Sequence, residues 1–301
     1  MACRSIWSDR ASAFRSCKSR VQWYRAVGTT ATLEALLKRD RLLVVAALLC
    51  VITLSWGYIL AGAGSSMTAL EMTAMSRPIG LSDGAPANVR VMQSAAWGTG
   101  YAVLMFFMWW IMMLGMMLPS ATPMILLYAR LMRREKEKGA PYVSIGVFLL
   151  GYLVAWAGFS LVAVATQWAL GESGLLSGMM VGTSVPLGAG LLIAAGLWQL
   201  TPLKHACLRH CRSPIGFFSQ HWRNGSLGAF HMGVAHGAFC LGCCWVLMAL
   251  LFYGGVMNLY WIIGLALFVL IEKLIPAGNR IGQLTGLALI VWGGVLLFDL
   301  P

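Results

Sequence analysis

The chain has 301 residues, of which 59% are hydrophobic and only 11% are charged. A typical soluble domain carries about 45–50% apolar and about 25% charged residues, so a soluble globular fold is excluded. The same figures exclude an intrinsically disordered chain and a small secreted scaffold held by disulfides. The net charge of +12 would indicate nucleic-acid binding in a soluble protein, but in a membrane protein it has a different origin.

Seven apolar runs are long enough to be membrane-spanning helices, because about 20 residues cross a hydrocarbon core of roughly 30 Å. They cover residues 42–63, 100–128, 143–170, 185–203, 227–253, 256–275 and 281–298. We therefore expect an all-α fold, a polytopic bundle of seven transmembrane helices within a membrane domain of residues 41–301. Residues 1–40 are basic with interspersed aromatic side chains, which predicts either a cytoplasmic tail or a segment lying on an anionic membrane surface.

The distribution of basic residues predicts the orientation of the bundle. With the N-terminus in the cytoplasm, 20 of the 22 Lys and Arg residues fall in cytoplasmic segments. Because cytoplasmic loops are enriched in these residues, we expect an N-in, C-out protein of the bacterial inner membrane that contacts the lipid bilayer. The excess of positive charge then reflects orientation, and no nucleic-acid partner is expected.

Five of the eight cysteines and all five histidines lie between residues 205 and 244. The first group, Cys207, His210 and Cys211, falls in a predicted cytoplasmic loop. A spacing of four residues places both thiols on one face of a helical turn, and thiolate with imidazole suits Zn(II) or Cu(I). The alternative is a basic loop that binds lipid head groups and carries incidental thiols.

The second group lies within the predicted fifth span. At about 100° per residue, Met232, His236, Cys240 and Cys243 share an arc of about 80°, with Cys244 at its edge. A polar residue deep in a bilayer is costly and indicates function, although His236 as an interhelical hydrogen-bonder among packing cysteines is the alternative. One helix cannot surround an ion, so other helices or the loop of the first group must contribute.

The predicted second span carries a stripe of methionines. Met105, Met108, Met112 and Met116 recur at helical spacing, and neutral thioethers suit Cu(I). The stripe predicts either ordinary core packing or a route for a soft ion across the membrane. Near the inner end of the sixth span, Glu272 predicts either a cation or proton site or an ion pair with a neighbouring basic residue, for which the candidates are Lys204, Lys273 and Arg280.

Motifs of common enzymes are absent from the sequence. It contains no phosphate-binding P-loop, no GxSxG nucleophile elbow and no HExxH zinc motif. Enzymatic activity therefore stays open, with a binding protein favoured over an enzyme. Cys240 and Cys243 do have the CxxC spacing of a membrane thiol-disulfide oxidoreductase, which is the main alternative.

Several longer motifs follow one another in a fixed order. They are Met116-Met-Leu-Pro119-Ser, Gln199-Leu-Thr-Pro202-Leu-Lys204, Cys207-Leu-Arg-His210-Cys211-Arg-Ser-Pro214, His236-Gly-Ala-Phe-Cys240-Leu-Gly-Cys243-Cys244-Trp245, Gly254-Gly-Val-Met-Asn258-Leu and Glu272-Lys273-Leu. With these motifs, about residues 100–299 resemble a bacterial family of predicted metal-binding integral membrane proteins of unknown function. The resemblance implies metal binding through the Cys and His positions, here Cys207, His210, Cys211, His236, Cys240, Cys243 and Cys244.

These observations together predict a membrane protein that binds a soft transition metal and transports, delivers or senses it. Copper(I) is expected before zinc, because the candidate ligands are mostly sulfur. The two ligand groups form either separate sites or halves of one site. Residues of a possible metal path are Met112, Met116, Met232 and Glu272. A further alternative is an assembly factor that inserts metal into another membrane enzyme, so a metal-receiving membrane enzyme or chaperone is a candidate partner.

Overall fold

The computed structural model describes residues 42–65, 67–75, 97–137, 145–178 and 180–298. The chain divides into two compact units, Met1–Leu49 and Cys50–Pro301. The predicted basic segment 1–40 lies outside the described residues. In the first unit, residues 42–49 begin a helix, Leu42–Leu60, that continues into the second unit. The sections below concern the second unit.

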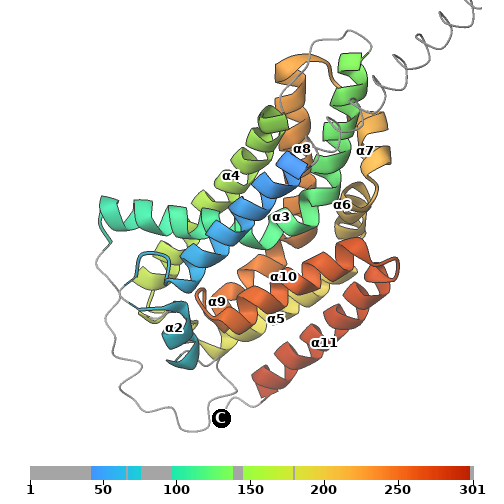
Figure 1. Cartoon of the computed structure of the whole chain (residues 1–301). Coiled ribbons are helices and arrows are strands. Elements are labelled where there is room, and N and C mark those ends of the chain that lie inside the picture. The colour runs from blue at the N-terminus through green and yellow to red at the C-terminus, as the bar shows by residue number, and fades with distance from the viewer. Residues whose placement is uncertain (1–41, 66, 76–96, 138–144, 179, 299–301) are drawn as a thin grey trace, which may run out of the picture. The chain divides into compact units, whose positions relative to one another are not determined.

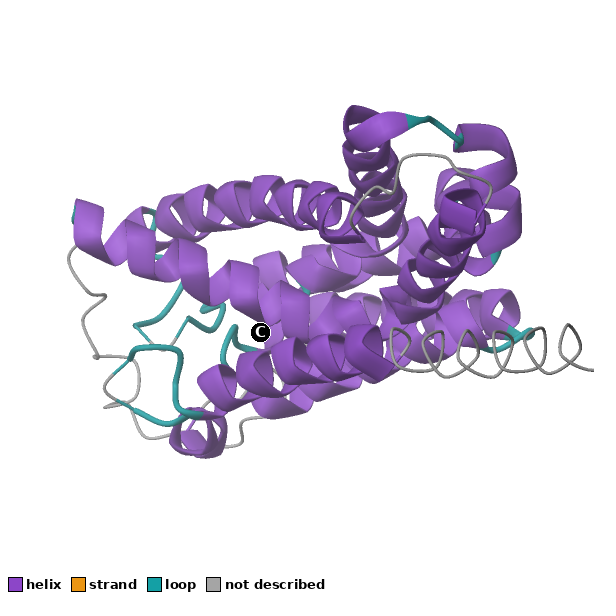
Figure 2. Ribbon diagram, turned by 45° about the horizontal axis from the view of Figure 1, so that its top comes forward, coloured by secondary structure: helices purple, strands orange, loops and turns teal. Residues whose placement is uncertain are grey.

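The described part of the second unit is built from helices, joined by turns and one isolated bridge between Leu176 and Gly182 (Figures 1 and 2). After the helix Leu42–Leu60, the elements in chain order are α2 (Ala69–Met75), α3 (Thr99–Glu137), α4 (Ile145–Glu172), α5 (Val185–Leu200), α6 (Pro202–Arg212), α7 (Pro214–His221), α8 (Gly225–Ala249), α9 (Leu251–Gly254), α10 (Leu259–Leu274) and α11 (Gly278–Phe298). The all-α prediction is confirmed for this part of the chain.

Five helical segments among the described residues are long and apolar enough to cross a membrane. They are Leu42–Leu60, Thr99–Glu135, Ile145–Glu172, Gly225–Gly254 and Gly278–Phe298. A sixth results if α5 and α6, which meet at an angle of 65°, form one broken span. The expected sixth span corresponds to α10, which has only 16 residues. The number of seven spans and the N-in, C-out orientation stay predictions.

The bend between α5 and α6 is centred on Thr201. Its backbone is extended (φ −71°, ψ 142°), and its hydroxyl accepts a hydrogen bond from the Lys204 N–H. Pro202 takes the first position of α6, where a missing N–H is tolerated, and its ring disfavours a helical conformation at Thr201. The predicted connection around Cys207 is therefore helical, which agrees with the helical turn expected for Cys207 and Cys211, and its cytoplasmic position stays a prediction.

Small residues allow two helix pairs to pack closely. Helix α4 packs against α8 and α5 against α11. A side chain on Gly151 of α4 would collide with the backbone of Phe230 in α8, and one on Gly196 of α5 would collide with that of Gly286 in α11. Such close approach through small residues is typical of helices packed in a membrane.

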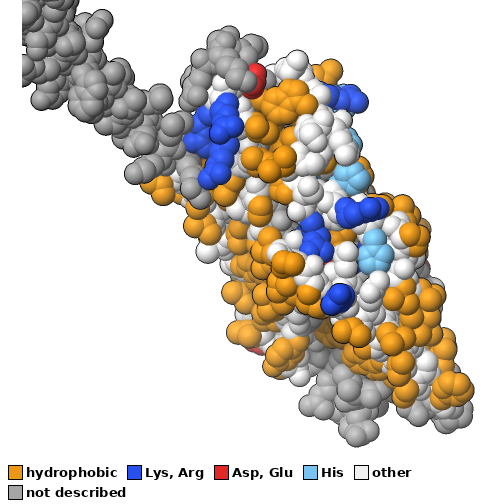
Figure 3. Space-filling model, turned by 90° about the vertical axis from the view of Figure 1, so that its right-hand side faces the viewer, with side chains coloured by type: hydrophobic (Ala, Val, Ile, Leu, Met, Phe, Trp, Pro, Cys, Tyr) orange, Lys and Arg blue, Asp and Glu red, His pale blue; other side chains and the backbone are white. Residues whose placement is uncertain are grey.

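The second unit exposes many large apolar side chains and buries several polar ones, although its core is still mostly hydrophobic. Leu161 and Val162 of α4 are 61% and 63% exposed, and Leu284 of α11 is 70% exposed. Polar and charged side chains buried inside are Ser55, Ser120, Ser160, Gln167, Gln199, Lys204, His236, Asn258, Glu272 and Lys273. In Figure 3, basic and His side chains gather in the upper part of the face, while hydrophobic ones cover much of the lower part. The pattern is consistent with membrane association.

Candidate metal centre

Cys240 of α8 lies at a point where charged and polar groups from three other helices converge. The ammonium group of Lys273 in α10 donates a hydrogen bond to the Cys240 sulfur at 3.0 Å and another to the Ser120 hydroxyl of α3 at 3.1 Å. The Tyr152 hydroxyl of α4 lies 3.4 Å from the same sulfur. All four side chains are buried. A buried ammonium is costly without partners, so these contacts explain how Lys273 is tolerated there.

The short helix α6 brings further thiols to this point. The thiol of Cys211 lies close enough to those of Cys240 and Cys243 to interact with both. One turn earlier in α6, the Cys207 sulfur packs against the backbone of Gly242, where an added Cβ would come within 2.7 Å of it. The two predicted ligand groups therefore meet, with Cys211 as the link between α6 and α8.

The other two thiols of α8 are turned toward their own backbone. Both Cys243 and Cys244 donate to the Cys240 carbonyl oxygen at 3.0 Å. Cys244 also lies near α3, with its sulfur 3.9 Å from that of Met117. Among the described residues, no three His, Cys, Asp or Glu side chains stand ready as a metal site. The donors are gathered, therefore, but not arranged in coordination geometry. We use "thiol cluster" below for Cys211, Cys240, Cys243 and Cys244.

His236 lies one helical turn before Cys240 and is 2% exposed. Its imidazole stacks on Tyr152 at 5.6 Å between ring centroids and packs near Phe148 and Phe217. Neither ring nitrogen has a hydrogen-bond partner among the described residues. Buried polar atoms are normally hydrogen-bonded, so an unpartnered imidazole beside a group of thiols is a candidate ligand.

His210 is placed differently from the thiols that flank it in the predicted motif. Its Nδ1 atom lies 2.9 Å from the Ala206 carbonyl oxygen, one turn back in α6. Its ring stacks face to face on Phe239, with centroids 4.1 Å apart and planes inclined by 3°. These contacts direct His210 toward aromatic neighbours and its own helix, rather than toward the thiol cluster.

The residues of the predicted metal path lie inside the bundle. Met112 and Met116 of α3 and Met232 of α8 are buried. Glu272 pairs with Lys204, with 2.5 Å between carboxylate oxygen and ammonium nitrogen, as one of the sequence alternatives expected. Its second oxygen, Oε2, has no hydrogen-bond partner among the described residues.

Sequence reasoning missed the roles of three groups at this site: Lys273, Ser120 and Tyr152. Met117 belongs to a second methionine stripe of the same predicted span, beside the first. A lysine within an apolar run was the available signal, because such residues are rare in membrane helices and usually functional. Lys273 was considered only as an ion-pair partner of Glu272. Nothing in the order of residues marks Tyr152 or Ser120, since each reaches Cys240 or Lys273 through tertiary packing.

The thiol cluster lies within a region that also matches a known family. A family model described as "PpoB2: Copper chaperone" matches residues 106–296, which covers nearly all of α3 and the chain through most of α11. No curated protein and no solved structure matches the chain. The match spans more than half of the sequence and includes all four thiols of the cluster. The chain belongs to the PpoB2 copper chaperone family.

Proposed function

We propose that this protein is a membrane-embedded copper chaperone that holds Cu(I) as cargo at the thiol cluster and passes it to a metal-receiving partner. The observation that carries the proposal is the convergence of Cys211 from α6 with Cys240 and Cys243 from α8. Thiols that are 29 and 32 residues apart in sequence meet inside a helix bundle of a copper chaperone family. A bound copper ion would use these converging thiols as its ligands.

The donor set supports copper(I) over zinc. Thiolate and thioether sulfur are soft ligands that select Cu(I), and Met117 adds a thioether 3.9 Å from Cys244. Thiolates also bind zinc, so the Met117 thioether and the copper chaperone family are what favour copper. Rotation of Cys243 and Cys244 away from the Cys240 carbonyl would turn their sulfur atoms toward a shared ion. His236 is a further donor of the proposed site.

Lys273 supplies the positive charge that this site requires. A Cu(I) ion held by two or more thiolates leaves net negative charge, which is costly in an apolar interior. The ammonium of Lys273 lies 3.0 Å from Cys240 and is fixed by Ser120, so it is placed to compensate that charge. We assign Lys273 as a positioning and charge-compensating residue of the site.

The surroundings of the site are part of the proposal. We propose seven spans in N-in, C-out orientation in a bacterial inner membrane, with the lipid bilayer covering the exposed apolar faces of α4 and α11. The buried Met112 and Met116 would line a path toward the thiol cluster, with Met232 and Glu272 beside it. Cys207 and His210 of α6 are then secondary, as half-buried groups beside the thiol cluster.

Cu(I) competition with a chromogenic chelator tests the proposal on purified protein in detergent. We expect Cys240→Ser with Cys243→Ser to lose the tight copper that wild type retains. The matched control is Cys50→Ser, since Cys50 is an exposed cysteine away from the cluster. Thermal unfolding of each variant verifies that it is folded. Equal copper retention in the wild type and the double variant would refute the proposed site.

A thiol-disulfide oxidoreductase is the second candidate, favoured by the proximity of Cys211 to a CxxC pair. A third thiol beside such a pair is placed for thiol–disulfide exchange. Thiol trapping with a maleimide under oxidising and reducing conditions separates the two functions. A reversible Cys240–Cys243 disulfide in protein that retains no copper would favour the oxidoreductase.

A further inference from the structure

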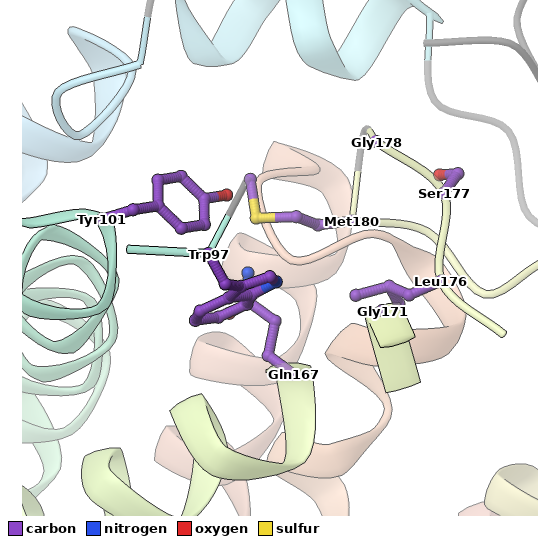
Figure 4. A pocket seen from close by; sticks show the side chains of 8 residues that line it. All are labelled: Trp97, Tyr101, Gln167, Gly171, Leu176, Ser177, Gly178 and Met180. Atoms are coloured by element: carbon purple, nitrogen blue, oxygen red, sulfur yellow. The ribbon is translucent and has the colours of Figure 1, made fainter. Parts of the chain in front are cut away.

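A pocket lies where α3 begins and α4 ends, far along α3 from the thiol cluster. Its volume is about 290 Å³ including its open side, and its lining includes Trp97, Tyr101, Gln167 and Met180 (Figure 4). None of its lining residues is Lys, Arg, His, Asp or Glu. The pocket therefore offers neutral donors, and these suit neither a hard cation, which needs carboxylates, nor an anion.

The Met180 side chain is held in this pocket by an unusual backbone. Met180 has a positive φ of 57°, which side-chain-bearing residues rarely adopt. Its N–H donates to the Ser177 carbonyl at 2.8 Å, and its carbonyl accepts from the Val256 N–H at 3.2 Å. Figure 4 shows the thioether reaching toward Tyr101, with the indole of Trp97 nearby. The rings of Trp97 and Tyr101 pack edge to face, 5.0 Å apart.

Gln167 connects this pocket to the methionine stripe of α3. Its amide nitrogen donates to the Met105 sulfur at 3.4 Å, and its oxygen accepts from the Trp109 indole N–H at 2.7 Å. Met105, the first methionine of the stripe, is 3% exposed. Gln167, which lines the pocket, therefore contacts the first thioether of the stripe directly.

The stripe then leads from the pocket to the thiol cluster. Met108, Met112 and Met116 follow Met105 on one face of α3, and all three are buried. At about 1.5 Å of rise per residue, Met105 and Met116 are about 17 Å apart along the axis, in steps of about 4.5–6 Å. The adjacent Met117 reaches Cys244.

We propose that the pocket is a port at which Cu(I) binds transiently, through the Met180 thioether and the aromatic ring of Trp97, before it travels along the methionine stripe to the thiol cluster. A soft monovalent cation is the ligand that neutral sulfur and an electron-rich indole recognise together. The proposal rests on the proposed function, since it gives the copper of the thiol cluster a second binding point. With N-in, C-out orientation, the port faces the outer side of the membrane.

Methyl NMR on the full chain, labelled with ¹³C-methyl methionine and titrated with Ag(I) as a redox-stable probe for Cu(I), tests the port. Met180→Leu identifies the Met180 signal, and Met75 is the control, as a methionine 41% exposed on α2. We expect Ag(I) to shift the Met180 signal before that of Met75, in wild type and equally in Cys240→Ser/Cys243→Ser protein. A Met180 signal that does not move, or moves only together with Met75, would overturn the port.

The two proposals fail separately in this experiment. Ag(I) that shifts Met180 but leaves wild-type thiols open to maleimide refutes the thiol site and leaves the port. Ag(I) that protects the thiols without moving Met180 refutes the port alone. As a kinetic readout, Met180→Leu is expected to slow copper loading of the thiol cluster about tenfold at unchanged final stoichiometry. An unchanged loading rate would also overturn the port.

Discussion

The thiol cluster and the pocket lie beside α3 at Met117 and near Met105, which are about 18 Å apart along the helix axis. The two regions differ in the formal charge of the side chains around them. Around the cluster, two lysines and one glutamate are buried, and Lys273 donates directly to Cys240. Around the pocket, no lining residue carries a formal charge. Both regions contain sulfur that could bind a metal, as cysteine thiols in the cluster and as the Met180 thioether in the pocket.

Under the two proposals, this difference in charge distinguishes the thiol cluster, which retains copper, from the pocket, through which copper passes. Thiolates bind Cu(I) tightly but bring negative charge, which must be compensated inside an apolar bundle. Thioethers are neutral, so an ion bound to them alone keeps its positive charge and is held more weakly. Under the proposals above, copper is retained where buried charges surround the thiols and passes where the lining is neutral.

The largest expected effect comes from breaking the Lys204–Glu272 ion pair beside the cluster. Lys204→Met leaves the 2%-exposed Glu272 carboxylate without its partner and is expected to destabilise the protein by about 3–5 kcal/mol. Chemical denaturation in detergent measures the loss. Replacing both residues with Met removes both charges and should restore most of the stability. A single variant as stable as wild type would contradict the structural role of the pair.

Removing the charge of Lys273 is expected to weaken copper binding more than it weakens the fold. In Lys273→Met, Cys240 loses its charged donor, and Cu(I) affinity should fall about 10- to 100-fold, as for a charge-assisted hydrogen bond of roughly 1.5–3 kcal/mol. Chelator competition measures the affinity, and Lys273→Arg should retain most of it because the charge stays. Equal affinities in the Met and Arg variants would show that the charge is unimportant.

How far the sequence predicts this molecule depends on whether a feature is local. Hydropathy places α4, α8 and α11 within about four residues, because each helix is a continuous apolar run, whereas α3 continues to Glu137, nine residues beyond the predicted end of its span. The spacing of Cys240 and Cys243 identifies one face of α8 in the same way. The sequence does not predict the bend at Thr201. This bend sets the direction of α6 and places Cys211 beside the other thiols.

Charged partners were harder to predict for a similar reason. The pairing of Glu272 with Lys204 was one of several alternatives, because apolar helices allow many registers between distant residues. His210 shows the same limit, since its motif places it beside two predicted ligand cysteines while its ring stacks on Phe239. Side-chain direction on a short helix follows from packing, which residue order alone does not specify.

Substitutions in the methionine stripe, which lies between the pocket and the thiol cluster, are expected to have a smaller effect. Leu and Met have similar volumes, so Met112→Leu with Met116→Leu should cost less than about 1.5 kcal/mol of stability. Stopped-flow measurement of copper loading is then expected to show slower filling of the thiol cluster, while final copper content stays unchanged. A variant that loads at the wild-type rate would assign these methionines to core packing alone.

The smallest expected effect concerns α2, at the end of α10 remote from Lys273. Thr68 and Glu71 cap this helix reciprocally: the Thr68 N–H donates to the Glu71 carboxylate at 2.8 Å, and the Glu71 N–H donates to the Thr68 hydroxyl at 3.3 Å. The Thr68 hydroxyl also donates to the Glu71 carboxylate at 2.9 Å, and the two bonds that this carboxylate accepts lower the pKa of the exposed Glu71 carboxyl below its usual value of 4.5.

A carboxyl with a lowered pKa stabilises the folded helix above its unfolded pKa, and that contribution is lost as the pH falls through the folded pKa. Hydrogen exchange at α2 should therefore show weaker protection, corrected for intrinsic rates, near pH 3 than near pH 6. Thr68→Ala should show the weaker protection already near pH 6. The Thr73 hydroxyl of α2 accepts a hydrogen bond from the Leu259 N–H at 2.9 Å. Amides at the N-terminus of α10 should therefore lose protection together with those of α2. Copper retention at the thiol cluster should stay unchanged in Thr68→Ala, and a loss there would show that the two ends are coupled through α10.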